Sequence, residues 1–239
     1  MKIKSLVVSI LCAQGLVACG GGGTSAAPPG VGDPAPTPVP TQAVAGPVVR
    51  IDAAIANLYL APHHFERTET VPTTNITYNG VADFSTGADV SVEGANVKSA
   101  SVQRSLTKAD GTAVRKSSEI SYFQSAPYRL IATQSLDSSY YQVVSQQVAL
   151  PDTSKAGDSG AFYNATVYES SAKKTVLSTS KYTWTVSADS ADSLTFCVNS
   201  ITISPAVPGT VANSECYKVS TSNATVPDTV IAVSFTVPK

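Results

Sequence analysis

Residues 181–187 read Lys-Tyr-Thr-Trp-Thr-Val-Ser and alternate between polar and apolar side chains. Tyr182, Trp184 and Val186 fall on one face of an extended chain, and the lysine, threonines and serine fall on the other. Because successive side chains of a β-strand point to opposite faces, the stretch predicts a strand with one face in a core and one face in water. Such one-sided burial is typical of an antiparallel sheet.

The same alternation, enriched in Ser, Thr, Val and Tyr, continues through most of the chain after residue 62. Asn79-Gly80 and Asp110-Gly111 each separate two such runs, and both dipeptides are typical of tight β-hairpins. The residues expected on the core face of the last run are Ile231, Val233, Phe235 and Val237. Roughly ten such strands with short polar turns predict a mainly β domain, either an antiparallel β-sandwich or an open barrel.

One segment ahead of the strands has a different period. Its apolar residues are Ile51, Ala54, Ile55, Leu58 and Tyr59. This spacing predicts one short N-terminal amphipathic helix that ends before Pro62. A strand is the alternative, since Leu58 and Leu60 also alternate around Tyr59.

The N-terminus has the layout of an export signal, with Lys2 and Lys4 ahead of an apolar run over residues 6–13. Residues 16–19, Leu-Val-Ala-Cys, resemble the lipobox of bacterial lipoproteins. The resemblance implies that residues 1–18 are a signal peptide and that Cys19 carries a diacylglycerol that anchors the chain to a membrane. The alternative is an ordinary secretory signal with an incidental cysteine.

Residues 19–46 follow the signal peptide and are rich in Pro, Gly, Ala, Thr and Ser. This composition predicts a disordered tether between Cys19 and the folded domain. Gly20 resembles the outer-membrane sorting pattern of Gram-negative lipoproteins, which implies an outer-membrane anchor. The glycine run resembles many betaproteobacterial and neisserial lipoproteins. The segment from Leu150-Pro151 to Cys216-Tyr217 resembles a domain of uncharacterised betaproteobacterial lipoproteins, and that resemblance implies no activity. Residues 47–239 are then expected to be a single β-rich domain that faces either the periplasm or the medium.

The cysteines fit an oxidising compartment. Cys12 leaves with the signal and Cys19 is the anchor, so Cys197 and Cys216 remain in the folded part and are predicted to form a disulfide. By strand parity both thiols lie off the core face, which suits a link between neighbouring strands. Two metal ligands or two free thiols are the alternatives.

Charge and histidine content limit the other classes of function. The chain has 16 basic and 17 acidic residues and no dominant basic patch, so we expect no nucleic-acid partner. His63 and His64 with Glu66 have the ligand types of a metal site, but adjacent side chains diverge and a third ligand at a recognised spacing is missing. Exposed loop histidines are the preferred interpretation, and we expect neither metal nor cofactor.

Residues 157–160, Gly-Asp-Ser-Gly, resemble the nucleophile motif of trypsin-like serine proteases, with His64 and Asp110 upstream in the family's order. The resemblance implies Ser159 as a nucleophile. The sequence departs from the family because Ala161 replaces the next glycine and the specificity-pocket motif is absent. A polar turn is the alternative, since Gly, Asp and Ser are turn-forming residues.

The preferred functional hypothesis is a non-enzymatic envelope or binding module with a protein, glycan or lipid partner. The alternative is a carrier of a lipid or other apolar ligand inside an open barrel, and a serine hydrolase using Ser159 is a remote third. The aromatic residues that would either fill or line the interior are Tyr59, Phe65, Phe84, Phe123, Phe162, Trp184, Phe196 and Phe235.

Overall fold

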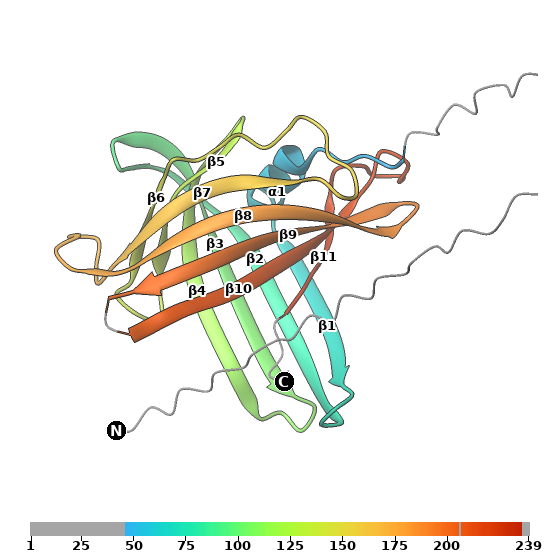
Figure 1. The fold of residues 1–239 in the computed structure, drawn as a ribbon, viewed down its shortest axis with the longest axis horizontal. Helices are drawn as coiled ribbons and strands as arrows, with labels where there is room; N and C mark the ends of the chain where they lie inside the picture. Colours follow the sequence, from blue (N-terminus) through green and yellow to red (C-terminus); the bar gives the residue numbers. More distant parts are fainter. Residues whose placement is uncertain (1–45, 206, 236–239) are drawn as a thin grey trace, which may run out of the picture. The chain divides into compact units, whose positions relative to one another are not determined.

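The computed structural model describes residues 46–205 and 207–235, which contain one helix and eleven strands. Each strand pairs antiparallel with the next along the chain, so one sheet runs in the order β1 to β11 (Figure 1). The elements are α1 (Ile51–Leu60), β1 (His63–Val71), β2 (Ile76–Val92), β3 (Ala95–Lys108), β4 (Ala113–Ser125), β5 (Tyr128–Ser135), β6 (Tyr141–Ser145), β7 (Ser159–Tyr168), β8 (Val176–Ser190), β9 (Ser193–Ser204), β10 (Val207–Ser220) and β11 (Val230–Val233).

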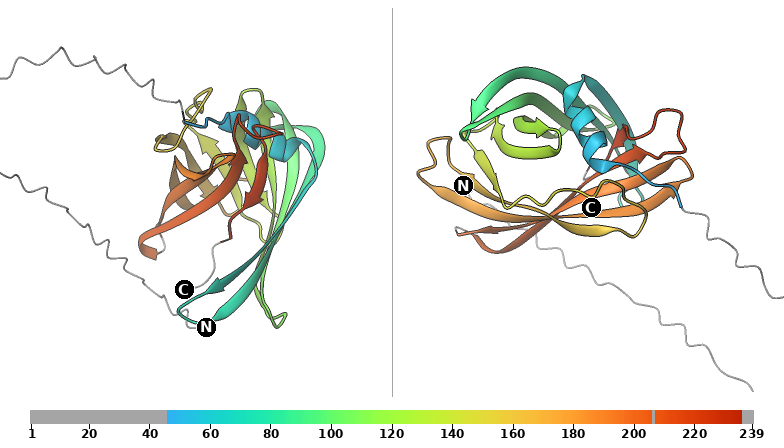
Figure 2. Two further views of the ribbon diagram at one scale, coloured as in Figure 1. Left: turned by 90° about the vertical axis from the view of Figure 1, so that its right-hand side faces the viewer. Right: turned by 90° about the horizontal axis from the view of Figure 1, so that it is seen from above.

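The sheet curls into a nearly closed barrel, so the predicted mainly β, antiparallel fold is confirmed in its open-barrel form (Figure 2). Among the described residues no ladder joins β1 to β11, and this is where the barrel stays open. A sheet curled in this way turns one face of its strands to the interior and the other to water, although residues 85–91 of β2 and 113–116 of β4 are exposed on both faces.

The alternation in residues 181–187 is confirmed. Trp184 and Val186 are buried, whereas Thr185 is exposed. Trp184 is paired with Val198 on β9, and Val198 is paired with Glu215 on β10. These three side chains therefore point to the same, inner face of the sheet. Strand parity therefore assigns residues to the inside of the barrel correctly in this part of the chain.

The predicted helix is confirmed as α1, and the alternative strand is wrong. Ile51, Ala54 and Leu58 have almost no exposed surface, and they pack in the same core cluster as residues of most strands. The ring of Tyr59 lies between those of Phe84 and Phe123, with centroid distances of 5.7 and 5.3 Å. The helix thus covers one end of the barrel interior, as the view from above shows (Figure 2).

Asp228 fixes the start of α1. Its carboxylate accepts hydrogen bonds from the backbone N and the Nε of Arg50, both at 2.8 Å. The amides of the first helical turn have no partner within a helix, and α1 has no side-chain cap of its own. A carboxylate from the β10–β11 connection therefore holds the helix against the barrel.

The predicted hairpin at Asp110-Gly111 is confirmed, but the one at Asn79-Gly80 is wrong. β2 runs straight through Gly80, and the preceding turn lies between Val71 and Ile76. Gly80 is required for a different reason: a Cβ there would lie 2.5 Å from the ring of Phe235. A glycine in a strand can mark a close approach as well as a turn.

The predicted core face of the last strand is also partly wrong. Val230 and Val233 are buried, but Ile231 is 48% exposed. Val219 pairs with Val230 while Lys218 pairs with Ala232, so Ile231 is an extra residue in β11 and points outward. Such a bulge shifts the alternation by one residue.

Some predictions concern residues outside the described ranges. The signal peptide, Cys19 and the tether up to residue 45 lie there, as does Val237. In the part of the chain that the structure covers, no helix has both the length and the apolar character needed to cross a membrane.

Candidate functional site

The interior of the barrel contains two adjoining cavities. The helix-side cavity has a volume of about 200 Å³ and is bordered by Ile55 of α1, and the Phe235-side cavity has a volume of about 230 Å³. The two share the residues Glu119, Asn213, Ser214 and Glu215 in their walls. Concave interior sites with a few convergent polar groups are the usual ligand-binding sites of barrels.

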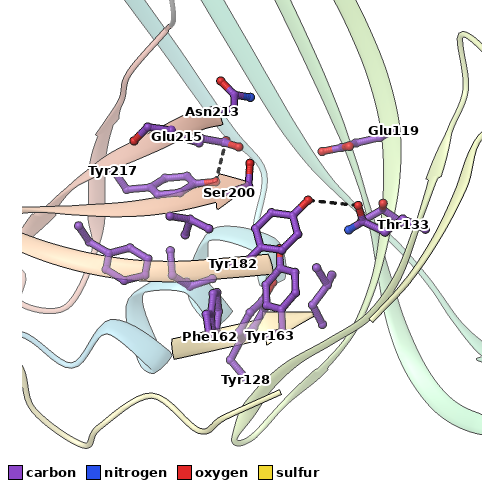
Figure 3. A pocket seen from close by; sticks show the side chains of 16 residues that line it. Glu119, Tyr128, Thr133, Phe162, Tyr163, Tyr182, Ser200, Asn213, Glu215 and Tyr217 are labelled. Carbon is purple, nitrogen blue, oxygen red and sulfur yellow. Dashed lines mark hydrogen bonds between the residues drawn. The ribbon is translucent and has the colours of Figure 1, made fainter. Parts of the chain in front are cut away.

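A charged cluster lies where the cavities meet. Arg104 on β3 donates one hydrogen bond to Oε1 of Glu119 on β4 at 2.9 Å and another to Oε1 of Glu215 on β10 at 2.6 Å. The two carboxylates point toward each other from opposite sides of the barrel (Figure 3). Arg115 also borders the Phe235-side cavity, and its positive charge helps to lower the pKa of Glu215.

The pKa values keep this cluster ionised. Burial alone would raise the pKa of Glu215, but the charge of Arg104 and a hydrogen bond from Tyr217 outweigh it, so the pKa lies below its usual range. Burial likewise opposes the charged form of Arg104, but Glu215 and Glu119 raise the pKa of the guanidinium well above its usual value. Charged groups inside a core are costly unless they are paired, and here the pairing is internal to the barrel.

Tyrosines form much of the wall of the helix-side cavity. The rings of Tyr163 and Tyr182 stack at a centroid distance of 4.2 Å. Tyr217 donates to Glu215 at 2.7 Å and Tyr182 donates to Gln142 at 3.2 Å (Figure 3). By contrast, no hydrogen bond within the described ranges reaches the hydroxyl of Tyr163.

The hydroxyl of Tyr128 likewise receives no hydrogen bond from the described residues. Tyr128 and Tyr163 are 7% and 8% exposed, and both line the helix-side cavity. Burial raises the pKa of each phenol well above its usual value, so both hydroxyls stay protonated. Among the described residues, the side-chain atoms buried without a partner are Arg104 Nε, Gln147 Oε1 and Ser154 Oγ, so the two tyrosine hydroxyls open onto the cavity, where an occupant can reach them.

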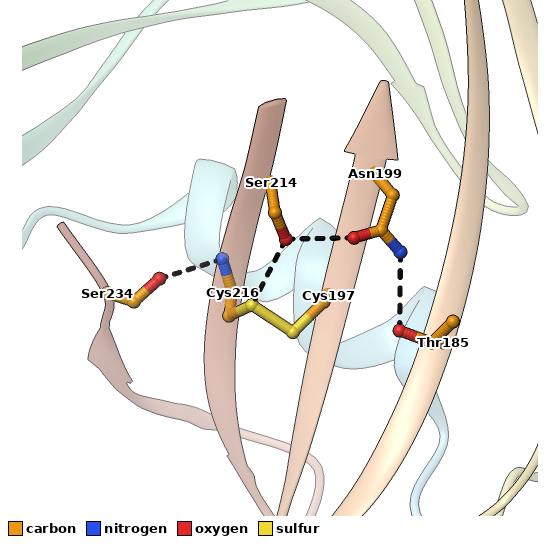
Figure 4. Close-up of a disulfide and its surroundings, with 6 residues drawn as sticks. All are labelled: Thr185, Cys197, Asn199, Ser214, Cys216 and Ser234. Carbon is orange, nitrogen blue, oxygen red and sulfur yellow. Dashed lines mark hydrogen bonds between the residues drawn. A yellow bond between two sulfur atoms is a disulfide. The ribbon is translucent and has the colours of Figure 1, made fainter. Parts of the chain in front are cut away.

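The predicted disulfide between Cys197 and Cys216 is confirmed, and it lies on the outer face of the barrel behind this site (Figure 4). The two cysteines are directly opposite each other on β9 and β10, with their Cα atoms 4.0 Å apart. Cys216 lies between Glu215 and Tyr217 along β10. The disulfide therefore fixes the strand that carries two of the inward-facing polar groups.

The histidines lie in a strand, so their assignment to a loop is wrong. His63 and His64 begin β1. His64 is held by Asp83 at 2.5 Å and by Glu66 at 3.0 Å, and the hydrogen bonds to Asp83 and then Glu66 raise the pKa of the imidazole. Over the described residues no group of three or more His, Cys, Asp or Glu side chains has an arrangement suited to a metal ion.

The structure does not bring Ser159, His64 and Asp110 together. Ser159 begins β7, His64 is on β1 with its ring nitrogens turned to other carboxylates, and Asp110 accepts a hydrogen bond from the backbone N of Thr112. Asp158 accepts from the backbone N of Lys155, and Gly157 has a φ of +95°. These contacts are those of a polar turn, which was the alternative interpretation.

The sequence analysis did not identify the hydrogen-bonded charged cluster of Arg104, Glu119 and Glu215. A usable signal was present, because Arg104 falls on the same strand parity as the buried Val102 and Leu106. Glu215 has the same parity as the buried Tyr217. A charged residue on the apolar face of a strand is unusual enough to mark an interior site.

Comparison with protein-family models, with curated proteins and with solved structures finds no match to this chain.

Proposed function

We propose that the barrel is a ligand-binding module that holds a small polar molecule in its interior. The observation that carries the proposal is the helix-side cavity with its two unpartnered tyrosine hydroxyls, Tyr128 and Tyr163. A ligand in the cavity could form hydrogen bonds with both hydroxyls, each worth about 0.5–1.5 kcal/mol. The charged cluster of Arg104, Glu119 and Glu215 would orient the bound ligand through further hydrogen bonds.

The cavity walls argue against the alternative of a lipid carrier. A site for an acyl chain needs an apolar lining, because an unpaired charge next to hydrocarbon is costly. Here Glu119 and Glu215 line both cavities and are hydrogen-bonded to Arg104. Each cavity also lies below the range of about 300–1,000 Å³ that is usual for drug-sized ligands. A small polar occupant fits both features better.

The N-terminal sequence adds a location to this proposal. The lipobox ending in Cys19, together with Gly20, supports a module that is anchored by lipid to the outer membrane. The tether would let the barrel meet its ligand away from the bilayer surface.

Native mass spectrometry on the full chain, released gently from its own membranes, tests the proposal. Ser200 lines the helix-side cavity, whereas its neighbour Ile201 is 54% exposed on the outer face. Ser200→Phe would fill the cavity and Ile201→Phe would place the same ring in solvent. We expect a bound small molecule in the wild type and in Ile201→Phe, and its loss in Ser200→Phe. A bare wild-type mass, with no thermal stabilisation by a library of small metabolites, would contradict the proposal.

A further inference from the structure

The chemistry of the helix-side cavity identifies a ligand class, an inference that rests on the proposed function. Both carboxylates of the cluster, Glu119 and Glu215, line the wall of this cavity. Arg104 and Arg115 line only the other cavity, and among the described residues that border the helix-side cavity there is no Lys, Arg or His. The occupant therefore meets carboxylates without an opposing positive wall.

The acceptor atoms at the cavity are incompletely used. Arg104 and Tyr217 both donate to Oε1 of Glu215, and Arg104 also donates to Oε1 of Glu119. Within the described part of the chain, no hydrogen bond reaches Oε2 of either glutamate. Carboxylate oxygens accept strong charge-assisted hydrogen bonds, so two of them remain for N–H donors of a ligand.

The aromatic walls of the cavity also favour a positively charged ligand. Tyr128, Tyr163 and Tyr182 line the cavity, and the negative face of an aromatic ring attracts a cation within about 6 Å of its centroid. The unpartnered hydroxyls of Tyr128 and Tyr163 are additional acceptors. An anion would meet two carboxylates instead, and the Nη atoms of Arg104 are already engaged by them.

We propose that the helix-side cavity binds a small primary ammonium compound, with its N–H groups directed to Glu119 and Glu215 and its carbon skeleton among the tyrosine rings. The cavity volume of about 200 Å³ equals roughly seven water molecules at ~30 Å³ each, which restricts the ligand to a compact amine. Both carboxylates and the neutral phenols accept hydrogen bonds, which matches the three donors of a primary ammonium group.

Isothermal titration calorimetry on the full chain in mild detergent at pH 7 tests the ligand class. The probes are butylammonium and 2-phenylethylammonium, each compared with the alcohol of the same skeleton (1-butanol, 2-phenylethanol) and with an anion of similar size (butyrate, 3-phenylpropionate). We expect at least one amine to bind tenfold or more tightly than its alcohol and the anions not to bind. If neither amine exceeds its alcohol, the ammonium assignment is wrong.

Charge-removing variants locate the binding. Glu215→Gln and Glu119→Gln are each expected to weaken amine binding tenfold or more while leaving the alcohol unchanged. Glu93→Gln is the matched control, because Glu93 also accepts from a tyrosine and a basic residue, Tyr141 and Lys173, but lies away from both cavities. Equal losses in all three variants would contradict the assignment of the site.

Tyr163→Phe keeps the ring and removes an unpartnered hydroxyl. This variant tests amine binding in the cavity if the glutamate variants fail to fold. We expect a several-fold loss of amine affinity, and unchanged affinity would contradict the proposed contact. The outcomes also separate the two proposals. Alcohol or anion binding that Ser200→Phe abolishes would refute the ammonium ligand while keeping the binding module. A bare mass in the native-source experiment, with no thermal stabilisation by small metabolites or by the amines, would refute both.

Discussion

Gly80→Ala should destabilise the barrel because of Phe235, and the size of the effect follows from the geometry. The added Cβ would lie 2.5 Å from two atoms of the Phe235 ring, whereas non-bonded carbons need about 3.5–4.0 Å. The ring must retreat from Tyr78 and Leu106, its neighbours in a small apolar cluster. Phe235 is only partly buried, so the lost burial is about half of the ~1.5–3 kcal/mol of a full phenylalanine. Alanine regains about 0.5–1 kcal/mol over glycine in a strand.

The net loss expected for Gly80→Ala is therefore about 0.3–0.5 kcal/mol. Urea unfolding followed by the fluorescence of Trp184, the one tryptophan of the chain, measures it. In a Phe235→Ala background the same substitution should be neutral or stabilising, so the double-mutant cycle should show a coupling of about 1 kcal/mol or more. A turn at Asn79-Gly80 would instead penalise alanine equally in both backgrounds. An equal penalty would refute the close-approach explanation.

Three further outcomes are expected. Reduction of the Cys197–Cys216 disulfide, which closes a loop with a sequence separation of 19, should lower the free energy of unfolding by about 3 kcal/mol, and an unchanged urea midpoint with reductant would count against this. Because the folded-state pKa of Glu215 is lowered, its ionisation stabilises the fold above the unfolded-chain value of about 4.3 and loses that contribution as the pH falls through the folded value. The difference in unfolding free energy between wild type and Glu215→Gln should thus shrink between pH 7 and pH 3, and a constant difference would contradict the role of the Arg104 pair. Cys19→Ala should move the chain from the membrane fraction to the soluble fraction, whereas continued retention with an unprocessed signal would contradict the lipobox interpretation.

Strand parity could be predicted from sequence wherever one face of the sheet is buried. Tyr182, Trp184 and Val186 alternate with polar residues because the barrel has a single inside. The same rule placed Cys197 and Cys216 on the outer face, where they form the disulfide. In these strands the local pattern and the tertiary environment impose the same period of two.

The failures have specific physical causes. Gly80 was assigned to a turn because the requirement for glycine there comes from Phe235, which is distant in sequence. Ile231 was assigned to the core because a bulge, which depends on pairing with β10, changes the alternation. Arg104 and Glu215 were missed because composition counts charges without regard to the face on which they lie. Long-range contacts of this kind leave little trace in a local pattern.

The central claim is that the helix-side cavity holds a small ligand. The most direct measurement is a high-resolution crystal structure of the chain purified from its own cell envelope without a denaturing step. We expect non-water density in the helix-side cavity, within hydrogen-bonding distance of the hydroxyl of Tyr128 or Tyr163 and of a free carboxylate oxygen of Glu119 or Glu215. A cavity filled by ordered water alone, or closed by rearranged side chains, would contradict it.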